Sequence, residues 1–63
     1  MAIIHFLRAL VSNGGCLTQK YSYNKYGKMI LQKSLEYKYI KNNELKYCIT
    51  KKGRKEVKDF DSY

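Results

Sequence analysis

The sequence predicts an α+β domain with a core of three helices, a two-stranded β-hairpin and a C-terminal helix. Apolar residues repeat at helical spacing in two segments, residues 2–12 and 24–37. Two short alternating segments then flank Asn42 and Asn43, which tolerate the positive φ that a tight hairpin turn needs. The second alternating segment ends at Thr50, a residue suited to cap a following helix.

The first helix, over residues 2–12, should carry a broad apolar face. The face is wider than one small core requires, and a domain of this size buries only about 60% of its unfolded surface. This surplus favours a homodimer formed through the first helix, the last helix, or both. Asn13, Gly14 and Gly15 should end the helix. The face consists of Ile3, Phe6, Leu7 and Leu10, with Ile4 and Val11 beside it.

Two further helices should follow. Thr18 can cap a short helix over about 18–23, and a longer helix should run over about 24–37. Gly27 lies inside the longer helix, where glycine costs about 1 kcal/mol relative to alanine. The inward side of the longer helix should consist of Tyr26, Ile30, Leu31, Ser34, Leu35 and Tyr37. The outward side should present Lys25, Lys28, Gln32 and Glu36 at steps of three and four residues.

The predicted hairpin spans residues 38–49, and strand residues alternate between its two faces. Its core side should carry Tyr47, Ile49 and either Tyr39 or Ile40, while Lys41 and Lys46 point outward.

The last helix should span residues 51–60. Val57 and Phe60 should turn inward, helped by the aliphatic stem of Arg54. The acidic residues should lie on the far side of this helix, pointing away from a polyanion. They are Glu56, Asp59 and Asp61.

The charge of the chain is strongly positive. Thirteen Lys and Arg stand against five Asp and Glu, a formal net charge of +8, and residues 1–35 contain no acidic side chain. An uncompensated basic surface attracts polyanions with an affinity that falls steeply as salt rises. Two other readings stay open, solubility alone and an anionic membrane. No lysine-faced amphipathic helix with a broad apolar side supports the membrane as a partner.

The apolar run near the N-terminus does not predict a membrane span. His5 and Arg8 interrupt it, and it is far shorter than the ~20 residues that cross a bilayer. No basic segment precedes it, as a secretory signal would need. With no linker composition anywhere in the chain, we expect a single domain, 1–63, in the cytoplasm, or in the host cytoplasm if the protein is viral.

The sequence offers little material for catalysis or ligand binding. Cys16 and Cys48 have no further ligands at zinc spacing, so no metal is expected. Intracellular disulfides are rare, which favours free thiols, with a bridge within the chain or across a dimer as the alternative in a thermophilic archaeon. His5 is the single histidine and lies in an apolar helix. We therefore expect no enzyme, no cofactor and no small-molecule ligand.

The segment from Leu35 to Gly53 resembles the winged helix-turn-helix DNA-binding family, especially small transcription regulators of archaea and archaeal viruses. The motif that carries the resemblance is tyrosine-x-isoleucine-threonine-x-x-glycine, here Tyr47, Ile49, Thr50 and Gly53. The resemblance implies a homodimer that binds double-stranded DNA sequence-specifically, with a reading helix in the major groove and the hairpin as a wing on the backbone. By position, the reading helix supplies Asn24, Lys25, Lys28 and Gln32, and the wing supplies Lys41, Asn42, Asn43 and Lys46.

Three further residues belong to the predicted DNA-binding site. Tyr21 and Tyr23, beside Lys20, can hydrogen-bond phosphate oxygens or stack on bases of a single strand. A duplex binder should gather its lysines on one continuous face, whereas a protein-interaction module should expose an apolar patch there. A single-strand or RNA binder should expose both tyrosines.

Overall fold

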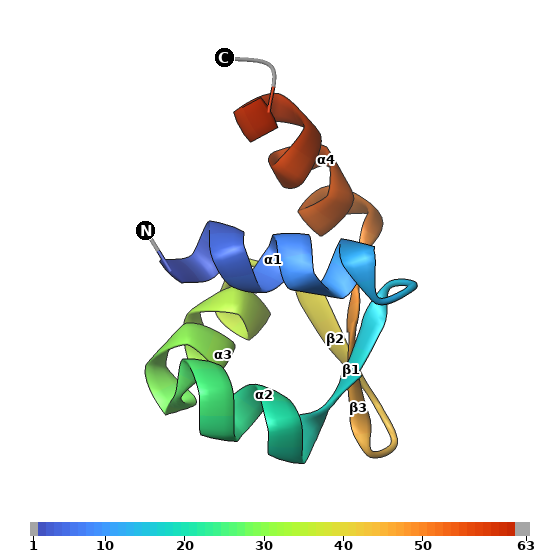
Figure 1. Cartoon of the computed structure of the whole chain (residues 1–63). Coiled ribbons are helices and arrows are strands. Elements are labelled where there is room, and N and C mark those ends of the chain that lie inside the picture. Colours follow the sequence, from blue (N-terminus) through green and yellow to red (C-terminus); the bar gives the residue numbers. More distant parts are fainter. Residues whose placement is uncertain (1, 62–63) are drawn as a thin grey trace.

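The computed structural model describes residues 2–61, which form four helices and a three-stranded antiparallel sheet (Figure 1). The first helix, α1, crosses the middle of the molecule. The last helix, α4, lies on one side of it, while α2, α3 and the hairpin tip lie on the other. The described part of the chain is therefore an α+β fold. In chain order the elements are α1 (Ala2–Ser12), β1 (Cys16–Thr18), α2 (Gln19–Tyr26), α3 (Lys28–Glu36), β2 (Ile40–Asn43), β3 (Lys46–Ile49) and α4 (Lys51–Asp61).

The centre of the core is the apolar face of α1. Phe6, Leu7 and Leu10 have no exposed surface, and the ring of Tyr26 at the end of α2 packs on Phe6 at 4.9 Å between centroids. Val11, predicted to lie beside this face, is 38% exposed. The other buried members of this core are Ile4, Leu31, Ile40, Ile49 and Val57. Helices α2, α3 and α4 and strands β1 and β3 therefore all pack against one central helix.

A glycine pair ends α1 as the sequence predicts. Gly14 and Gly15 adopt φ of 79° and 103°, and the amide of Gly15 donates to the carbonyl of Leu10 at 2.7 Å. This turn leads directly into β1, a strand that the sequence analysis missed. A three-residue strand is too short to show a period, and its pairing partner lies about 30 residues further along the chain. The hairpin is therefore part of a three-stranded sheet with the order β1-β3-β2.

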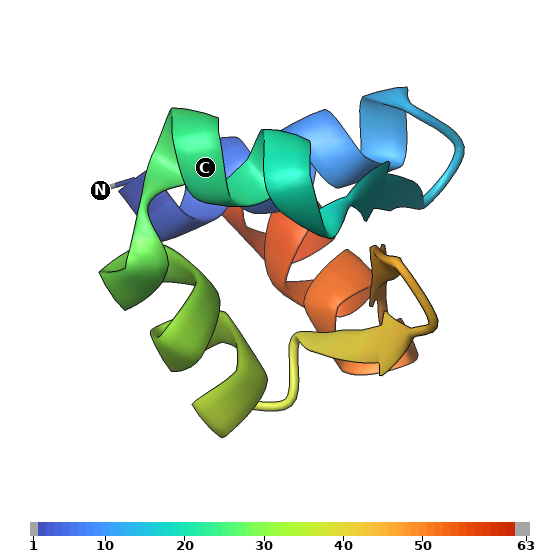
Figure 2. The ribbon, with the colours of Figure 1, turned by 90° about the horizontal axis from the view of Figure 1, so that it is seen from below.

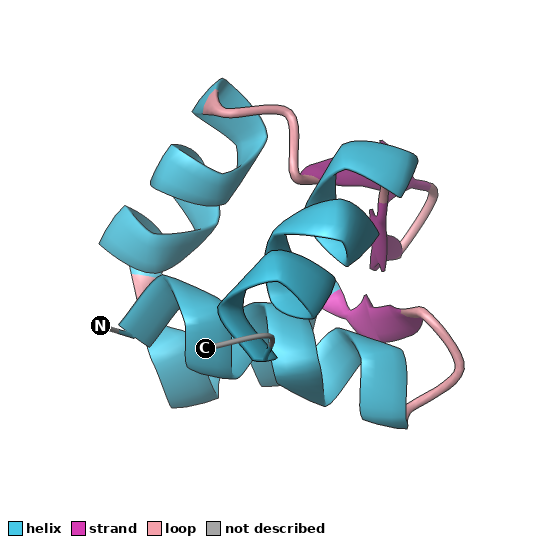
Figure 3. Cartoon of the chain, turned by 90° about the horizontal axis from the view of Figure 1, so that it is seen from above, coloured by secondary structure: helices cyan, strands magenta, loops and turns pink. Residues whose placement is uncertain are grey.

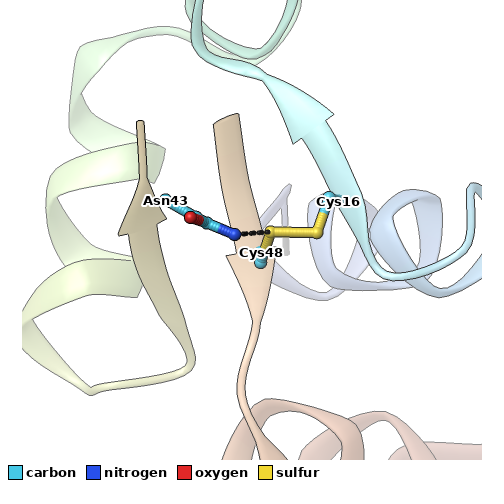
Figure 4. Close-up of a disulfide and its surroundings, with 3 residues drawn as sticks. All are labelled: Cys16, Asn43 and Cys48. Atoms are coloured by element: carbon cyan, nitrogen blue, oxygen red, sulfur yellow. Dashed lines mark hydrogen bonds between the residues drawn. A yellow bond between two sulfur atoms is a disulfide. The ribbon is translucent and has the colours of Figure 1, made fainter. Parts of the chain in front are cut away.

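Cys16 and Cys48 form a disulfide, so the expectation of free thiols is wrong (Figure 4). The two residues lie directly opposite each other in the β1–β3 pair, with Cα atoms 4.1 Å apart. Cys16 lies opposite Cys48 only because β1 pairs with β3. The disulfide was therefore missed because strand β1 was missed. Disulfides persist in oxidising compartments and inside hyperthermophiles.

The prediction of one long helix over 24–37 is wrong, because the helix is interrupted at Gly27. This glycine has φ of 87° and ψ of 162°, and its amide donates to the carbonyl of Tyr23, which ends α2. The short helix predicted over 18–23 is correspondingly longer, although Thr18 caps it as expected by accepting from the amide of Tyr21. Gly27 thus separates two helices, and it does not destabilise the interior of one helix.

The hairpin turn also differs from the prediction. Asn42 and Asn43 belong to β2 and pair with Tyr47 and Lys46, and the turn lies at Glu44 and Leu45. Glu44 supplies the positive φ, 59°, that the sequence analysis assigned to the asparagines. The choice of core-facing residues is correct: Ile40 and Ile49 are buried and Tyr47 is half-buried, while Lys41 and Lys46 are exposed.

The start of α4 lies close to the backbone of Lys38 and Tyr39, in the turn between α3 and β2. The hydroxyl of Thr50 accepts from the amide of Gly53 at 3.1 Å and donates to the carbonyl of Lys38 at 2.7 Å. A Cβ on Gly53 would overlap the carbonyl oxygen of Tyr39. Thr50 therefore caps α4, and Gly53 allows the helix to pack closely against the backbone of Tyr39.

Further along α4, some predicted orientations are wrong. Phe60 is 49% exposed, with the guanidinium of Arg8 5.2 Å from its ring. Asp61 forms an ion pair with the same arginine and Glu56 lines a groove beside Tyr39, so neither points to the far side of the helix. These orientations depend on contacts between α4 and α1. The sequence pattern of α4 alone does not contain those contacts. Tyr37, predicted to point inward from α3, is also 45% exposed.

Candidate nucleic-acid interface

All eleven residues predicted to bind DNA are exposed, and they come from four elements. Helix α2 supplies Lys20, Tyr21, Tyr23, Asn24 and Lys25, helix α3 supplies Lys28 and Gln32, and the hairpin supplies Lys41, Asn42, Asn43 and Lys46. Viewed from below, α2, α3 and the hairpin lie around one end of the molecule (Figure 2). We call this the helix–hairpin end.

The break at Gly27 divides the residues assigned to one reading helix. Asn24 and Lys25 lie in the last turn of α2, whereas Lys28 and Gln32 lie one turn apart on α3. Assignment of all four to one helix is therefore wrong. Helix α3 has only nine residues, and its first turn begins with Lys28.

A groove at the helix–hairpin end joins the three elements. Lys28 and Gln32 stand on one wall, and Tyr47 of β3 stands on the other. The complete lining is Tyr23, Lys28, Leu31, Gln32, Leu35 and Tyr47. The groove thus combines one cation, one amide and two tyrosine hydroxyls over an apolar floor, a mixture that can hydrogen-bond and stack. Tyr47 was predicted only as a core residue, and nothing in its local sequence distinguishes the two roles.

Tyr21 and Lys25 form a pair one turn apart on α2. The ammonium of Lys25 donates to the Tyr21 hydroxyl at 3.2 Å and lies 5.7 Å from the centre of its ring. The hydrogen bond to Tyr21, followed by the electrostatic effects of Tyr21 and Tyr26, raises the pKa of Lys25. Tyr21 and Tyr23 are 46% and 56% exposed. This is the exposure that the sequence analysis attached to a single-strand or RNA binder.

The two faces of the hairpin divide the predicted wing residues. Asn42 pairs with Tyr47 and lies on the face that includes the core residue Ile40. The other face carries the disulfide together with Lys41, Asn43 and Lys46. There the Asn43 amide lies 3.9 Å from the sulfur of Cys48 (Figure 4). The wing lysines therefore do not continue the groove wall.

Gln19 positions the hairpin tip, a role that the sequence analysis missed. Its backbone amide donates to the carbonyl of Leu45, and its side-chain amide donates to Asn42 Oδ1 and to the carbonyl of Glu44, both at 3.1 Å. The first residue of α2 thus holds the turn of the hairpin. Only the pairing of β1 with β3 brings these residues together, so no local pattern indicates the contact.

Two exposed apolar side chains near the helix–hairpin end were also missed. Met29 on α3 is 73% exposed, and Leu45 at the hairpin tip is 80% exposed. They come from different elements and do not line a common groove among those described. Acidic residues border the same end, with Glu36 4.0 Å from Lys33 on α3 and Glu44 at the tip.

Comparisons with known proteins add no assignment, since no family model, curated protein or solved structure matches the chain. Within residues 2–61, no helix has the length and apolar character needed to cross a bilayer. The same residues contain no cluster of three His, Cys, Asp or Glu side chains arranged to hold a metal ion. The functional assignment therefore depends on the geometry and charge described above.

Proposed function

We propose that the protein binds double-stranded DNA through a winged helix-turn-helix arrangement, with α3 as the reading helix and the β2–β3 hairpin as the wing, and that it regulates transcription. The observation that carries the proposal is the position of Lys28 and Gln32, which are exposed and lie one turn apart, as the first and fifth residues of α3. Lysine can bind guanine acceptors and glutamine can bind adenine through paired hydrogen bonds. The N-terminal residues of a recognition helix are those that reach base edges.

Surrounding residues support a duplex as the ligand. Lys20 and Lys25 of α2 and Lys41 and Lys46 of the hairpin are exposed, and they belong to the elements that form the helix–hairpin end. Such lysines would hold phosphates and set the register of α3. Gln19 fixes the hairpin relative to α2, so that the wing and the helices approach the duplex as one unit.

A homodimer is part of the proposal, because paired half-sites raise both affinity and specificity. An apolar groove offers the contact surface on α1, α4 and the turn after α3. It is lined by Ile3, Ile4, Leu7, Tyr37, Tyr39, Glu56 and Phe60. Half-exposed aromatic rings at its rim, those of Tyr37 and Phe60, are the kind of side chain enriched at protein interfaces.

The exposure of Tyr21 and Tyr23 favours a second candidate, binding of single-stranded DNA or RNA. Exposed tyrosines beside lysines stack on unpaired bases without regard to sequence. The difference between the two candidates lies in which groups contribute most to binding: Lys28 and Gln32 for a duplex, and the two rings for a single strand.

A salt titration read by fluorescence anisotropy tests the proposal. Duplex DNA, single-stranded DNA and RNA of equal length are compared, with the wild type, a Lys28→Ala/Gln32→Ala variant and a Tyr21→Leu/Tyr23→Leu variant. Tighter duplex binding with a steep salt slope, strongly weakened in the first variant, supports the proposal. Preference for single strands, lost in the second variant, supports the alternative. Failure to bind any probe at low salt would leave a protein-docking module as the remaining class.

A further inference from the structure

Helix α4 carries a second concentration of positive charge. Its sequence includes five cations, and a shallow surface groove brings all five together with one carboxylate. These groove residues are Lys51, Lys52, Arg54, Lys55, Lys58 and Asp59. The outward face of α4, defined by these six residues, was not part of the predicted site.

Packing against α1 separates the charges around the helix. Asp61 is paired with Arg8 of α1, and Glu56 lines the apolar groove beside Tyr39. Two of the three acidic side chains of α4 are thus turned away from the outward face, so the residues that line the groove are five cations and one carboxylate, Asp59. A helix whose overall charge is modest therefore presents a concentrated positive surface.

The outward face of α4 is remote from the helix–hairpin end. Helix α4 packs on α1 and β3, and in Figure 1 it lies across α1 from α2, α3 and the hairpin tip. When the molecule is viewed from above, the helix that leads to the C-terminus lies in front (Figure 3). One duplex bound at the helix–hairpin end would leave this face open to solvent.

We propose that the outward face of α4 binds the phosphate backbone of a second nucleic-acid duplex, so that the protein bridges two duplex segments. The inference rests on the proposed function, which supplies the first segment. Lys51, Lys55 and Lys58 follow one another at four- and three-residue steps and span roughly 10 Å along the helix axis. A DNA strand carries one phosphate per about 3.4 Å of axis, so this row faces about three phosphates.

The chemistry of the face favours nucleic acid over an anionic membrane. A helix that lies in a membrane surface inserts its apolar side among the lipids. In α4 that side is occupied, because Val57 and Gly53 are buried in the protein. The outward face presents the head groups and aliphatic stems of five cations together with the carboxylate of Asp59. The residues that line the face are all charged, which suits contacts with phosphate oxygens.

A two-duplex capture experiment tests the inference. One unlabelled duplex is immobilised, protein is added, and retention of a second, fluorescent duplex is measured together with affinity for a single duplex. The α4 variant is Lys51→Gln/Lys55→Gln, in which both exposed lysines lose their charge. The charge-matched control is Lys33→Gln/Lys38→Gln, since neither residue lines the α4 groove or the helix–hairpin groove.

The expected result is at least tenfold less capture by the α4 variant, with single-duplex affinity within threefold of the wild type and the control unchanged. Capture that persists in the α4 variant would overturn the inference, because two helix–hairpin ends of a dimer would then be bridging. Binding of anionic phospholipid vesicles that the α4 variant loses, with capture unchanged, would overturn it in favour of a membrane surface.

The groove variant Lys28→Ala/Gln32→Ala separates the two proposals. If both hold, this variant keeps weak, salt-sensitive duplex binding, and adding the α4 substitutions abolishes it. Wild-type protein that binds one duplex but captures no second would overturn bridging and leave the proposed function intact. Full binding by the groove variant, lost on α4 substitution, would overturn both the proposed groove and bridging, since α4 would be the one surface used.

Discussion

The helix–hairpin end and the outward face of α4 are both basic, but they are built differently. The first combines lysines with an amide and tyrosines from three elements, and its geometry depends on Gly27, Gln19 and the β1–β3 pairing. The second is a row of cations on one helix. An amide beside a lysine can discriminate between bases and tyrosine rings can stack on them, whereas a row of cations alone suits phosphates. Equal charge therefore does not mean equal function, and the two surfaces should respond differently to the same perturbations.

Removal of the disulfide should have the largest effect and should act on the helix–hairpin end. The Cys16→Ser/Cys48→Ser variant opens a loop with a sequence separation of 32 residues, which the chain-entropy model values at about 3–4 kcal/mol. Thermal unfolding measures the loss, and hydrogen exchange should rise more in β1 and α2 than in α4. Wild-type protein in reductant should match the variant. A loss below about 1 kcal/mol would show that strand pairing alone holds this end.

Gly53→Ala should damage the attachment of α4 instead. The new Cβ would overlap the carbonyl oxygen of Tyr39 and lie 2.7 Å from Ile49 Cγ1, so we expect a loss of about 2–3 kcal/mol by chemical denaturation. At an open helical site the same change would stabilise by about 1 kcal/mol, so the sign of the effect is itself decisive. Lys55→Ala, on the exposed side of α4, is the matched control and should change stability little.

Single lysine substitutions compare the two surfaces directly. Lys28→Ala should weaken duplex binding by about 1–3 kcal/mol and relax sequence specificity if the side chain reads a base. Lys51→Ala should leave the affinity for a single duplex nearly unchanged, and it should weaken capture of a second duplex whatever the sequence of that duplex. Anisotropy titrations on an optimal and a scrambled duplex, together with the two-duplex capture experiment, separate these results. Equal effects of both substitutions on both duplexes would remove the distinction between a reading surface and a holding surface.

The two threonine caps offer a smaller comparison. Thr50→Ala removes a bond to Gly53 and another to Lys38 at the start of α4, with an expected cost of about 1–2 kcal/mol. Thr18→Ala removes a longer bond, 3.3 Å to the amide of Tyr21, and should cost about 0.5–1 kcal/mol. Denaturant unfolding of both variants gives the order. The reverse order would mean that α2 depends more on its cap than α4 does.

The smallest expected effect is a loss of stability at alkaline pH, caused by Tyr39 where α4 packs on the rest of the molecule. Burial, with the nearby carboxylate of Glu56, raises the pKa of Tyr39 above its ordinary value of 10.0. The folded state then holds a proton that the unfolded state releases, so stability is complete below pH 10 and falls as pH rises through the raised pKa. Tyr39→Phe should remove this part of the alkaline loss. The exposed Tyr23→Phe serves as control, and an unchanged pH profile in the Tyr39 variant would contradict the assignment.

The parts of the fold that the sequence predicted correctly are those with a local cause. Helix α1 has a strong apolar period and a glycine pair at its end, and Thr18 and Thr50 carry recognisable cap chemistry. The hairpin was predicted with the correct inward residues because alternation is local. Its turn was misplaced because two asparagines are the stronger local signal, whereas contacts from Gln19 fix the tip at Glu44 and Leu45.

For the candidate site, the sequence predicted which residues are exposed but not how they are grouped. Asn24 and Lys25 lie on a different helix from Lys28, because Gly27 has a positive φ that ends the first helix. The helical pattern of the sequence does not indicate this φ. Lys41 and Lys46 were separated from Tyr47 by strand alternation within the observed register. The groove includes Tyr47, which no local signal distinguishes from an ordinary core residue.

The sequence by itself determined the class of fold, the excess of positive charge and the helix-capping residues, because composition and period act along the chain. Only the tertiary structure decided the third strand, the disulfide, the groove across three elements and the charge separation on α4. Each of these depends on contacts between residues distant in the sequence, such as Cys16 with Cys48 and Arg8 with Asp61. Such contacts form when several elements pack on α1 together, and no single segment carries the information for them.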